Sequence, residues 1–274
     1  MDEGNVLEVE IDQRVAVVTL NRPESLNSLN PPLMRRLAEA LQSLADDRAV
    51  ACVVLTGAGK GFCSGGDRGA VNKAVEDRLM PASPAIQAGS APRTTEQRAS
   101  WLRRCAEASR LLHEMPKPTI AMINGACAGA GMSLAAACDM RISARSAVFR
   151  TSFISSGLPG DYGGTWLWTR ILGPSKARQL YFFDERRNAA EALAFGLVDA
   201  VCPDENLVAE VMAKARYLAG LPGVGLAYAK DNLNKAMIED FAASLDRESL
   251  NLMMARDVLV EARKARNPAT GGAA

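Results

Sequence analysis

The stretch Asn124-Gly125-Ala126-Cys127-Ala128-Gly129-Ala130-Gly131 follows a short, continuously apolar segment, Thr119–Ile123. The apolar segment predicts a buried strand, and the glycines after it predict a tight turn. Small residues at such a turn let the backbone approach a ligand closely. A helix that begins there presents free N–H groups, which favour negative charge. The stretch therefore predicts a strand–turn–helix unit suited to binding an anion.

A second unit of the same kind lies upstream in the chain. The apolar segment Ala51–Leu55 predicts a strand, and Phe62-Cys63-Ser64-Gly65-Gly66-Asp67 follows it after a glycine-rich loop. Two N–H groups that converge on one oxygen form an oxyanion hole, in which one donor contributes about 3–4 kcal/mol to transition-state stabilisation. Two turns packed for purely structural reasons would have the same spacing, so spacing alone leaves both interpretations open.

The better-known glycine and serine motifs do not fit this chain. Leu134 stands where a dinucleotide fingerprint starting at Gly129 needs a third small residue, and Gly61 stands where a P-loop needs Ser or Thr. Ser64 is not in a G-x-S-x-G elbow, and the single histidine, His113, lies far away in a helical pattern. The sequence thus disfavours nucleotide binding and serine hydrolysis.

Composition narrows the class further. With 48% apolar and 23% charged residues, the chain has the composition of a soluble globular protein. A formal net charge of +1 disfavours nucleic acid or an anionic membrane as the main partner, because both need a basic excess. No apolar run approaches the roughly 20 residues that span a bilayer. The six cysteines show no C-x-x-C spacing, so we expect buried thiols in a reducing cytoplasm and no metal site.

The patterns around the two units indicate an α/β core. They predict a β-hairpin and an amphipathic helix over Val6–Ile11, Val15–Leu20 and Pro31–Asp47. Residues Met80–Thr95 have no periodicity and predict a long surface loop. From Pro203 onward the pattern is helical, with segments Val208–Leu218, Val224–Met237 and Ala242–Arg263. We therefore expect a core over 1–202 and a helical C-terminal region over 203–274.

Four ordered blocks resemble the crotonase (enoyl-CoA hydratase/isomerase) superfamily. Asn21–Leu29 is similar to the family's N-R-P-x-A-L-N-A-L, and Phe62–Asp67 to F-C-A-G-A-D. Lys117–Asp139 is similar to K-P-x-I-A-x-x-N-G-x-x-x-G-G-G-x-x-L-A-x-x-C-D. Gly157–Thr165 is similar to the G-x-x-P-x-x-G-G-T segment, with Pro159 one place early. The resemblance covers about Val6 to Pro268.

The resemblance implies a spiral of ββα units with a helical C-terminal trimerisation region. It also implies a homotrimer, or a hexamer built as a dimer of trimers. The substrate would be an acyl-coenzyme A thioester, with coenzyme A (CoA) as part of the substrate and no separate cofactor. The residue after Ser64-Gly65 supplies the first oxyanion N–H in the family, which is Gly66 here. The middle residue of the family's three glycines supplies the second, and here that is Ala130.

Further binding residues follow from the same resemblance. The N-terminal loop contacts adenine and pantetheine in the family, which implicates Ser25 and Leu26. The CoA phosphates meet basic side chains, some from the last helix of a neighbouring subunit. The candidates are Arg22, Arg263 and Lys264, although each would equally suit a solvated surface. Asp67 follows the first oxyanion residue as it does in the family, where its role is more often structural.

The chain departs from the family pattern at the positions of the catalytic carboxylic acids. Hydratases place one glutamate where Ser133 stands and a second where Phe153 stands, so an efficient two-glutamate hydratase is not expected. Asp161 is a new acid, at the position of a working aspartate in ring-modifying enoyl-CoA isomerases, CoA-linked dehalogenases and some carbon–carbon hydrolases. Its simpler interpretation is an N-cap of the next helix. Tyr162 would add a phenolic donor or serve packing.

The favoured reaction is proton transfer next to a thioester carbonyl, most simply isomerisation of an enoyl-CoA with Asp161 as the acid and base. Hydration, dehydration or carbon–carbon hydrolysis at the same site are alternatives. A non-catalytic acyl-CoA-binding homologue is another. The direction of the Asp161 carboxyl group separates the enzyme from the binding protein.

Overall fold

The computed structural model describes residues 5–67, 69 and 94–266. The loop predicted over Met80–Thr95 lies outside this range, apart from its last two residues. Thr94 and Thr95 instead begin a helix, because the Thr94 side chain accepts a hydrogen bond from the Gln97 N–H in a capping box.

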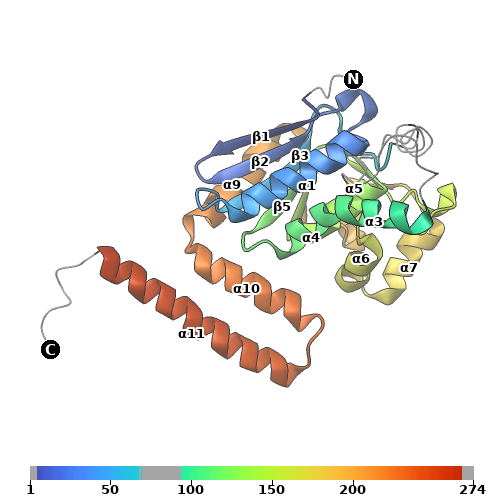
Figure 1. Ribbon diagram of the computed structural model, residues 1–274. Helices are drawn as coiled ribbons and strands as arrows, with labels where there is room; N and C mark the ends of the chain where they lie inside the picture. The colour runs from blue at the N-terminus through green and yellow to red at the C-terminus, as the bar shows by residue number, and fades with distance from the viewer. Residues whose placement is uncertain (1–4, 68, 70–93, 267–274) are drawn as a thin grey trace, which may run out of the picture.

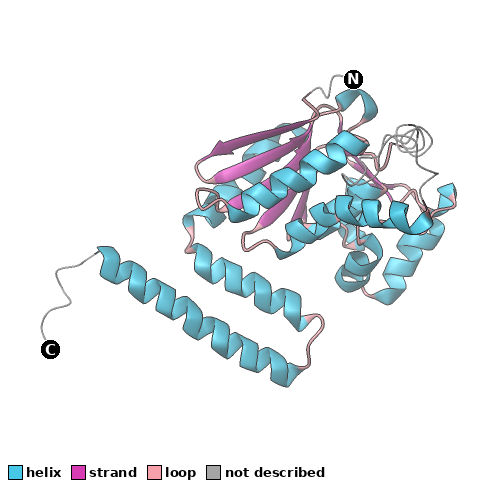
Figure 2. Ribbon diagram, in the orientation of Figure 1, coloured by secondary structure: helices cyan, strands magenta, loops and turns pink. Residues whose placement is uncertain are grey.

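Two sheets form the core, with helices packed around them (Figure 2). The larger has six strands in the order β1-β2-β3-β5-β7-β10. Its strands are β1 Leu7–Asp12, β2 Val15–Leu20, β3 Cys52–Gly57, β5 Thr119–Ile123, β7 Met140–Ala144 and β10 Ala200–Cys202. The first two form the predicted antiparallel hairpin, and the remaining neighbours are parallel.

The smaller sheet contains β4 Gly61–Cys63, β6 Ala126–Ala128, β8 Val148–Arg150 and β9 Arg187–Asn188. The pairs β3–β4, β5–β6 and β7–β8 each pass from the larger sheet to the smaller one, in the same sequence each time. This repeat gives the expected spiral. It also carries the two glycine-rich turns to one end of neighbouring parallel strands, β4 and β6.

Helices cover both faces of the larger sheet. One face packs against α1 (Pro31–Asp46), α4 (Glu107–Glu114) and α5 (Ala130–Ala137), and the other against α9 (Leu207–Gly220). The remaining helices of the core are α3 Thr95–Cys105, α6 Gly164–Leu172, α7 Pro174–Phe183 and α8 Ala189–Phe195. Short 3₁₀ turns lie at Pro23–Ser25, Ile154–Ser156 and Asp204–Asn206.

The C-terminal helices project from this core. After α9 come α10 (Gly223–Ala236) and α11 (Phe241–Arg266), which run antiparallel and extend away from the sheets (Figure 1). Lys230 fastens α10 to the core: its Nζ donates to the carbonyls of Leu112 and Lys117, at 2.9 and 3.1 Å, and to Asp139 Oδ2 at 2.9 Å. No helix in the described ranges has the length and apolar character needed to cross a membrane.

The predicted helices after Pro203 are present, but the first of them belongs with the core. Leu207, Val211, Ala215 and Ala219 lie on one face of α9 and are buried against the larger sheet. The projecting part of the chain therefore begins at α10.

Candidate active site

The N-terminal loop (residues 21–29) forms hydrogen bonds along the first glycine turn (residues 62–67) and fixes the shape of that turn. Ser64 donates through its N–H to the Leu26 carbonyl and through its hydroxyl to the Ser25 carbonyl, both at 3.0 Å. The Leu29 N–H donates to the Gly65 carbonyl at 2.7 Å, and the Asp67 N–H donates to the Leu29 carbonyl at 3.0 Å. The backbone of 64–67 is thus held on one side by the segment that contains Ser25 and Leu26.

The two glycine turns lie directly against each other. Gly65 adopts a φ of +99°, and a Cβ added there would lie 3.2 Å from the Ala128 carbonyl and 3.5 Å from the Ala130 nitrogen. Only glycine fits this conformation and this separation. The contact brings the segment ending in Gly66 beside the start of α5, as the sequence predicts.

Both predicted oxyanion donors are free in the described part of the chain. The N–H groups of Gly66 and Ala130 have no acceptor there. Ala130 is the first residue of α5, so its N–H precedes the first hydrogen bond within the helix. The positive end of the helix dipole adds to the attraction for an oxyanion at this position.

Arg22 and Asp67 pair with each other beside the hole. The Arg22 Nη2 atom lies 3.0 Å from Asp67 Oδ2, and Nη1 donates to the Ser28 carbonyl at 2.6 Å. The Arg22 side chain is 16% exposed. Its guanidinium group therefore holds the N-terminal loop against the first turn, a structural task that the sequence did not predict.

Asp161 lies near the first glycine turn, since its charge acts on the Cys63 thiol. Its Oδ1 atom is buried and has no hydrogen-bond partner among the described residues. Burial raises the pKa of Asp161 to about 6. Its charge also adds to the effect of burial in raising the pKa values of the Cys63 thiol and the Tyr181 phenol, which places the carboxylate near both groups.

The simpler interpretation of Asp161, as a helix cap, is wrong. The cap of α6 is Gly163, and no side chain makes a capping hydrogen bond. Asp161 contributes its backbone carbonyl instead, which accepts from the Gly164 N–H at 3.0 Å. The Oδ1 atom is therefore buried without the compensation that a cap would provide.

Ser133 and Tyr181 meet beside Asp161, and the sequence did not point to Tyr181. A Cβ added to Gly164 would lie 2.3 Å from Ser133 Oγ and 2.6 Å from the Tyr181 hydroxyl. The Ser133 hydroxyl is fully buried and has no hydrogen bond of regular geometry within the described residues, although its contact with Tyr181 partly offsets the rise in the pKa of that phenol. Tyr181 lies on α7 in an apolar run, Leu180–Phe183, which gives no sequence signal beyond packing.

Phe153 and Tyr162 complete this side of the site. The Phe153 ring is buried and stacks on Tyr181, with centroids 6.2 Å apart and planes 3° from parallel. Tyr162 has a φ of +50°, and its hydroxyl is buried without a partner in the described ranges. Burial raises its pKa well above the usual value, with Cys105, Asp161 and Cys63 adding to the effect. The phenol therefore stays protonated.

The nearby thiol is not a nucleophile. Burial raises the pKa of Cys63 to about 12, so the thiolate is essentially absent at neutral pH. His113 also lies apart from the reaction centre. Its ring packs edge-on against Trp166, and burial lowers its pKa.

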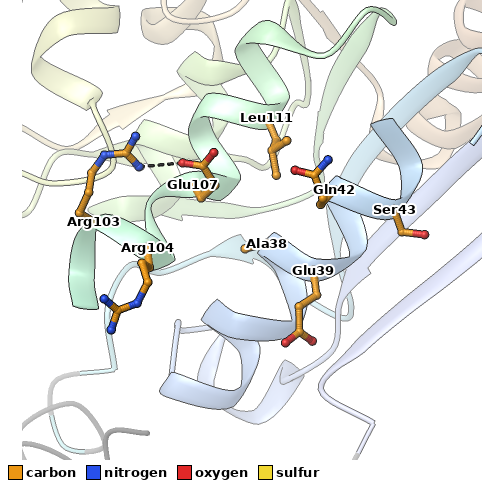
Figure 3. A pocket seen from close by; sticks show the side chains of 8 residues that line it. All are labelled: Ala38, Glu39, Gln42, Ser43, Arg103, Arg104, Glu107 and Leu111. Carbon is orange, nitrogen blue, oxygen red and sulfur yellow. Dashed lines mark hydrogen bonds and ion pairs between the residues drawn. The ribbon is translucent and has the colours of Figure 1, made fainter. Parts of the chain in front are cut away.

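Among the described residues, surface grooves lie both away from the predicted site and at its edge. One groove of about 840 Å³ lies between α1 and the α3–α4 pair, where Arg103 pairs with Glu107 (Figure 3). A smaller pocket of about 320 Å³ is lined by Tyr162 and Gly163 together with His113 and Trp166.

The two remaining predicted ligands lie elsewhere. Arg263 and Lys264 occupy the last turn of α11, which ends far from α5 in Figure 1. Lys264 pairs with Glu261 at 2.9 Å on the helix surface. Within one chain neither residue joins the site.

The geometry defines a class of protein. Two unbonded N–H donors on adjoining turns, with the buried and unpaired Asp161 Oδ1 atom near the first turn, suit the removal of a proton next to a carbonyl, with the negative charge held on oxygen. The chain belongs to the enoyl-CoA hydratase/isomerase family, whose sequence model matches residues 10–257.

Individual relatives agree with this assignment. The chain is 37% identical over 239 residues to the 1,2-epoxyphenylacetyl-CoA isomerase of Escherichia coli, covering 87% of this chain and 85% of the relative. It is 33% identical over 250 residues to a probable enoyl-CoA hydratase of Rhodobacter capsulatus, covering 89% and 87%. Among solved structures, a probable enoyl-CoA hydratase/isomerase from Mycobacterium abscessus has a TM-score of 0.79 at 31% identity, with 96% of each chain covered.

Proposed function

We propose that this protein isomerises an enoyl-CoA by moving a proton between the α- and γ-carbons of the acyl group, with Asp161 as the acid and base. The observation that carries the proposal is the carboxyl group of Asp161, whose Oδ1 atom is buried without a partner within the described chain. The Gly66 and Ala130 N–H groups would hold the thioester oxygen while the enolate exists. Coenzyme A enters as part of the substrate.

One carboxyl group is enough for this reaction. It accepts the proton from one carbon as a carboxylate and returns it to the other as a carboxylic acid, so no second acid is needed. Addition of water is less well served if, as the resemblance implies, Ser133 and Phe153 stand where hydratases of the family carry glutamates. Neither a serine alone nor a phenylalanine activates water. This absence favours isomerisation over hydration, although several relatives are named hydratases.

The energetic cost of Asp161 argues against a non-catalytic binding protein. A carboxylate buried without a hydrogen bond destabilises the fold, which is why its pKa rises. Such a cost is characteristic of functional sites. A protein that merely bound acyl-CoA would gain nothing from keeping this group.

The pH dependence of isomerisation tests the proposal. Proton removal needs the carboxylate, so kcat/KM should fall tenfold per pH unit as the pH drops below about 6, the pKa of Asp161. The value of kcat/KM falls towards low pH because the protonated carboxylic acid cannot accept a proton. The assay should be repeated with an acyl-pantetheine thioester, since a phosphate monoester also titrates near pH 6. Activity that stays level down to pH 4.5 would exclude Asp161 as the base.

We also infer that the chain assembles through its C-terminal helices. Apolar side chains are exposed on several faces of α11, among them Leu250 at 61% and Leu252 at 59%. Exposed apolar surface of this extent is typical of an interface. Sedimentation should therefore show a trimer or a dimer of trimers. Leu252→Glu should shift the population towards monomer, and a wild-type protein that is monomeric at micromolar concentration would contradict the inference.

A further inference from the structure

We propose that Tyr181 is a positioning residue for Asp161: its ring, anchored at the end of α7, holds the loop that carries the carboxyl group in its buried conformation. The inference rests on the proposed function, because it takes Asp161 as the group that must be held in place. It adds two residues that would act through Asp161, namely Tyr181 itself and Asp184, which anchors it.

The Tyr181 side chain contacts the loop on both sides of Asp161. A Cβ added to Gly160 would lie 3.3 Å from Tyr181 Cε1, and a Cβ added to Gly164 would lie 2.6 Å from the Tyr181 hydroxyl. Ser133 on α5 reaches the same place, with its Oγ atom 2.3 Å from the Cβ position on Gly164. The segment 160–164 is therefore in close contact with both α7 and α5, and neither glycine has room for a side chain.

The conformation of this loop needs such support. Three of its residues have positive φ: Gly160 at +121°, Tyr162 at +50° and Gly163 at +75°. A tyrosine in the left-handed region is strained, because its Cβ lies close to its own carbonyl oxygen. The Asp161 Oδ1 atom is buried without a hydrogen bond in the described ranges, which is also unfavourable. With looser packing around it, the loop would relax and admit water to the carboxyl group.

Asp184 fixes the end of α7 from which Tyr181 projects. It follows the last residue of that helix, has a φ of +50° and is 5% exposed. Its carboxylate accepts hydrogen bonds from the Thr151 hydroxyl at 2.8 Å, from the Ser152 N–H, and from the Ser155 N–H at 3.2 Å. Hydrogen bonds to a carboxylate are stronger than those between neutral groups. The segment 151–155 is thereby fastened to α7, three residues beyond Tyr181.

Phe153 connects this segment to the Tyr181 ring. It lies in the middle of 151–155, and its ring stacks on Tyr181 with centroids 6.2 Å apart and planes 3° from parallel. The Tyr181 ring is thus held by Phe153, while its Cε1 atom meets the loop of Asp161 at Gly160. A continuous set of contacts therefore runs from Asp184 through Phe153 and Tyr181 to the loop of Asp161.

Melting temperatures measured without substrate test the inference independently of turnover. At pH 8, Asp161→Asn should raise the melting temperature of the wild type, because it removes a buried carboxylate. In a Tyr181→Leu background the same substitution should give little or no gain, because the loosened loop lets water reach the carboxylate. Substitutions at independent sites have additive effects. An equal gain from Asp161→Asn in both backgrounds would therefore overturn the inference.

Kinetics provides a second readout. Tyr181→Leu should lower kcat by about 10²-fold with little change in KM, the expected effect of a misplacement of about 1 Å. The acid limb of kcat/KM should also move below about pH 6, because a hydrated carboxylate has a pKa closer to its ordinary value. Tyr181→Phe keeps the ring and should lose much less activity. A Tyr181→Leu enzyme with the kcat and the acid limb of the wild type would contradict the inference.

Asp184→Ala tests the anchor, and it keeps the inference testable where Tyr181→Leu does not fold. This variant loses the hydrogen bonds from 151–155, so the gain in melting temperature from Asp161→Asn should shrink in its background too. Asp184→Asn retains an acceptor oxygen for Thr151 and Ser152 and should show a smaller effect. An undiminished gain in the Asp184→Ala background would show that Asp184 does not act on Asp161.

Val211→Ala is the matched control for loss of packing. Val211 is fully buried on α9, against the other face of the larger sheet. This variant should lower the melting temperature and leave both the acid limb and the gain from Asp161→Asn unchanged. If Asp161→Asn keeps full activity while its gain in melting temperature depends on Tyr181, the proposed function fails and the role of Tyr181 in holding the loop stands.

Discussion

Asp161→Asn is expected to lower enoyl-CoA turnover by about 10²–10⁴-fold, the usual contribution of a positioned proton-transfer group. The substitution keeps the shape of the side chain and removes its ability to take up a proton. Thioester affinity should change little, because the N–H groups of Gly66 and Ala130 are untouched. Steady-state kinetics with a 3-enoyl-CoA thioester, together with a binding titration, would measure both quantities.

The same substitution should stabilise the fold. The pKa of Asp161 is raised by burial to about 6, so the folded state binds its proton more tightly than the unfolded state does. The stabilising effect of that proton is complete below the unfolded pKa and is lost as the pH rises through about 6. Above this value a buried asparagine is less costly than a buried carboxylate, so the melting temperature of Asp161→Asn should exceed that of the wild type at pH 8.

Asp199→Asn is the matched control for both readouts. Asp199 accepts hydrogen bonds from the Arg141 backbone and guanidinium group at 2.7–3.1 Å, away from the site. This variant should lose stability and keep activity, the opposite pattern. Full activity in Asp161→Asn would end the proposed mechanism.

Ala130→Pro is expected to reduce kcat by about 10²–10³-fold, because it deletes one donor of the oxyanion hole. Proline is well tolerated at the first position of a helix, where its missing N–H has no partner within the helix. Ala130 holds that position in α5. The preceding Gly129, with φ 53° and ψ −126°, adopts the mirror image of an extended conformation, which glycine tolerates before proline.

Ala130→Gly is the corresponding control, since it keeps the N–H group and should retain most of the activity. The melting temperature of Ala130→Pro should stay near that of the wild type, which distinguishes loss of the donor from loss of the fold. Wild-type turnover in a folded Ala130→Pro protein would remove Ala130 from the hole.

The oxyanion hole is well predicted from the sequence because short stretches of the chain determine the backbone conformation of the residues that form it. Gly65 and Gly129 adopt backbone conformations with positive φ, which favour glycine. The N–H group of Ala130 is free because Ala130 is the first residue of a helix. The hairpin and the strand over Thr119–Ile123 are equally local, and the structure reproduces both.

What the sequence does not predict depends on distant contacts. Asp161 lies in a Pro-Gly-Asp loop that carries no sequence signal of burial, yet its Oδ1 atom is buried in the fold. Tyr181 belongs to an apolar helical run, and its hydroxyl meets Ser133 only once α7 packs beside α6. Arg22 looks like a free phosphate ligand until the loop folds back and pairs it with Asp67.

Loss of isotope from the α-carbon is the most direct test of the central claim, that Asp161 removes the α-proton of an enoyl-CoA thioester. A 3-enoyl-CoA labelled with deuterium at the α-carbon would be incubated with the wild type and with Asp161→Asn, and the label followed by proton and deuterium NMR. With both α-hydrogens replaced by deuterium, one deuterium per molecule should leave the α-carbon in the wild type at the rate of isomerisation, passing to the γ-carbon or to solvent. In Asp161→Asn both deuterium atoms should remain on the α-carbon. Equal loss of label from both proteins would contradict the claim.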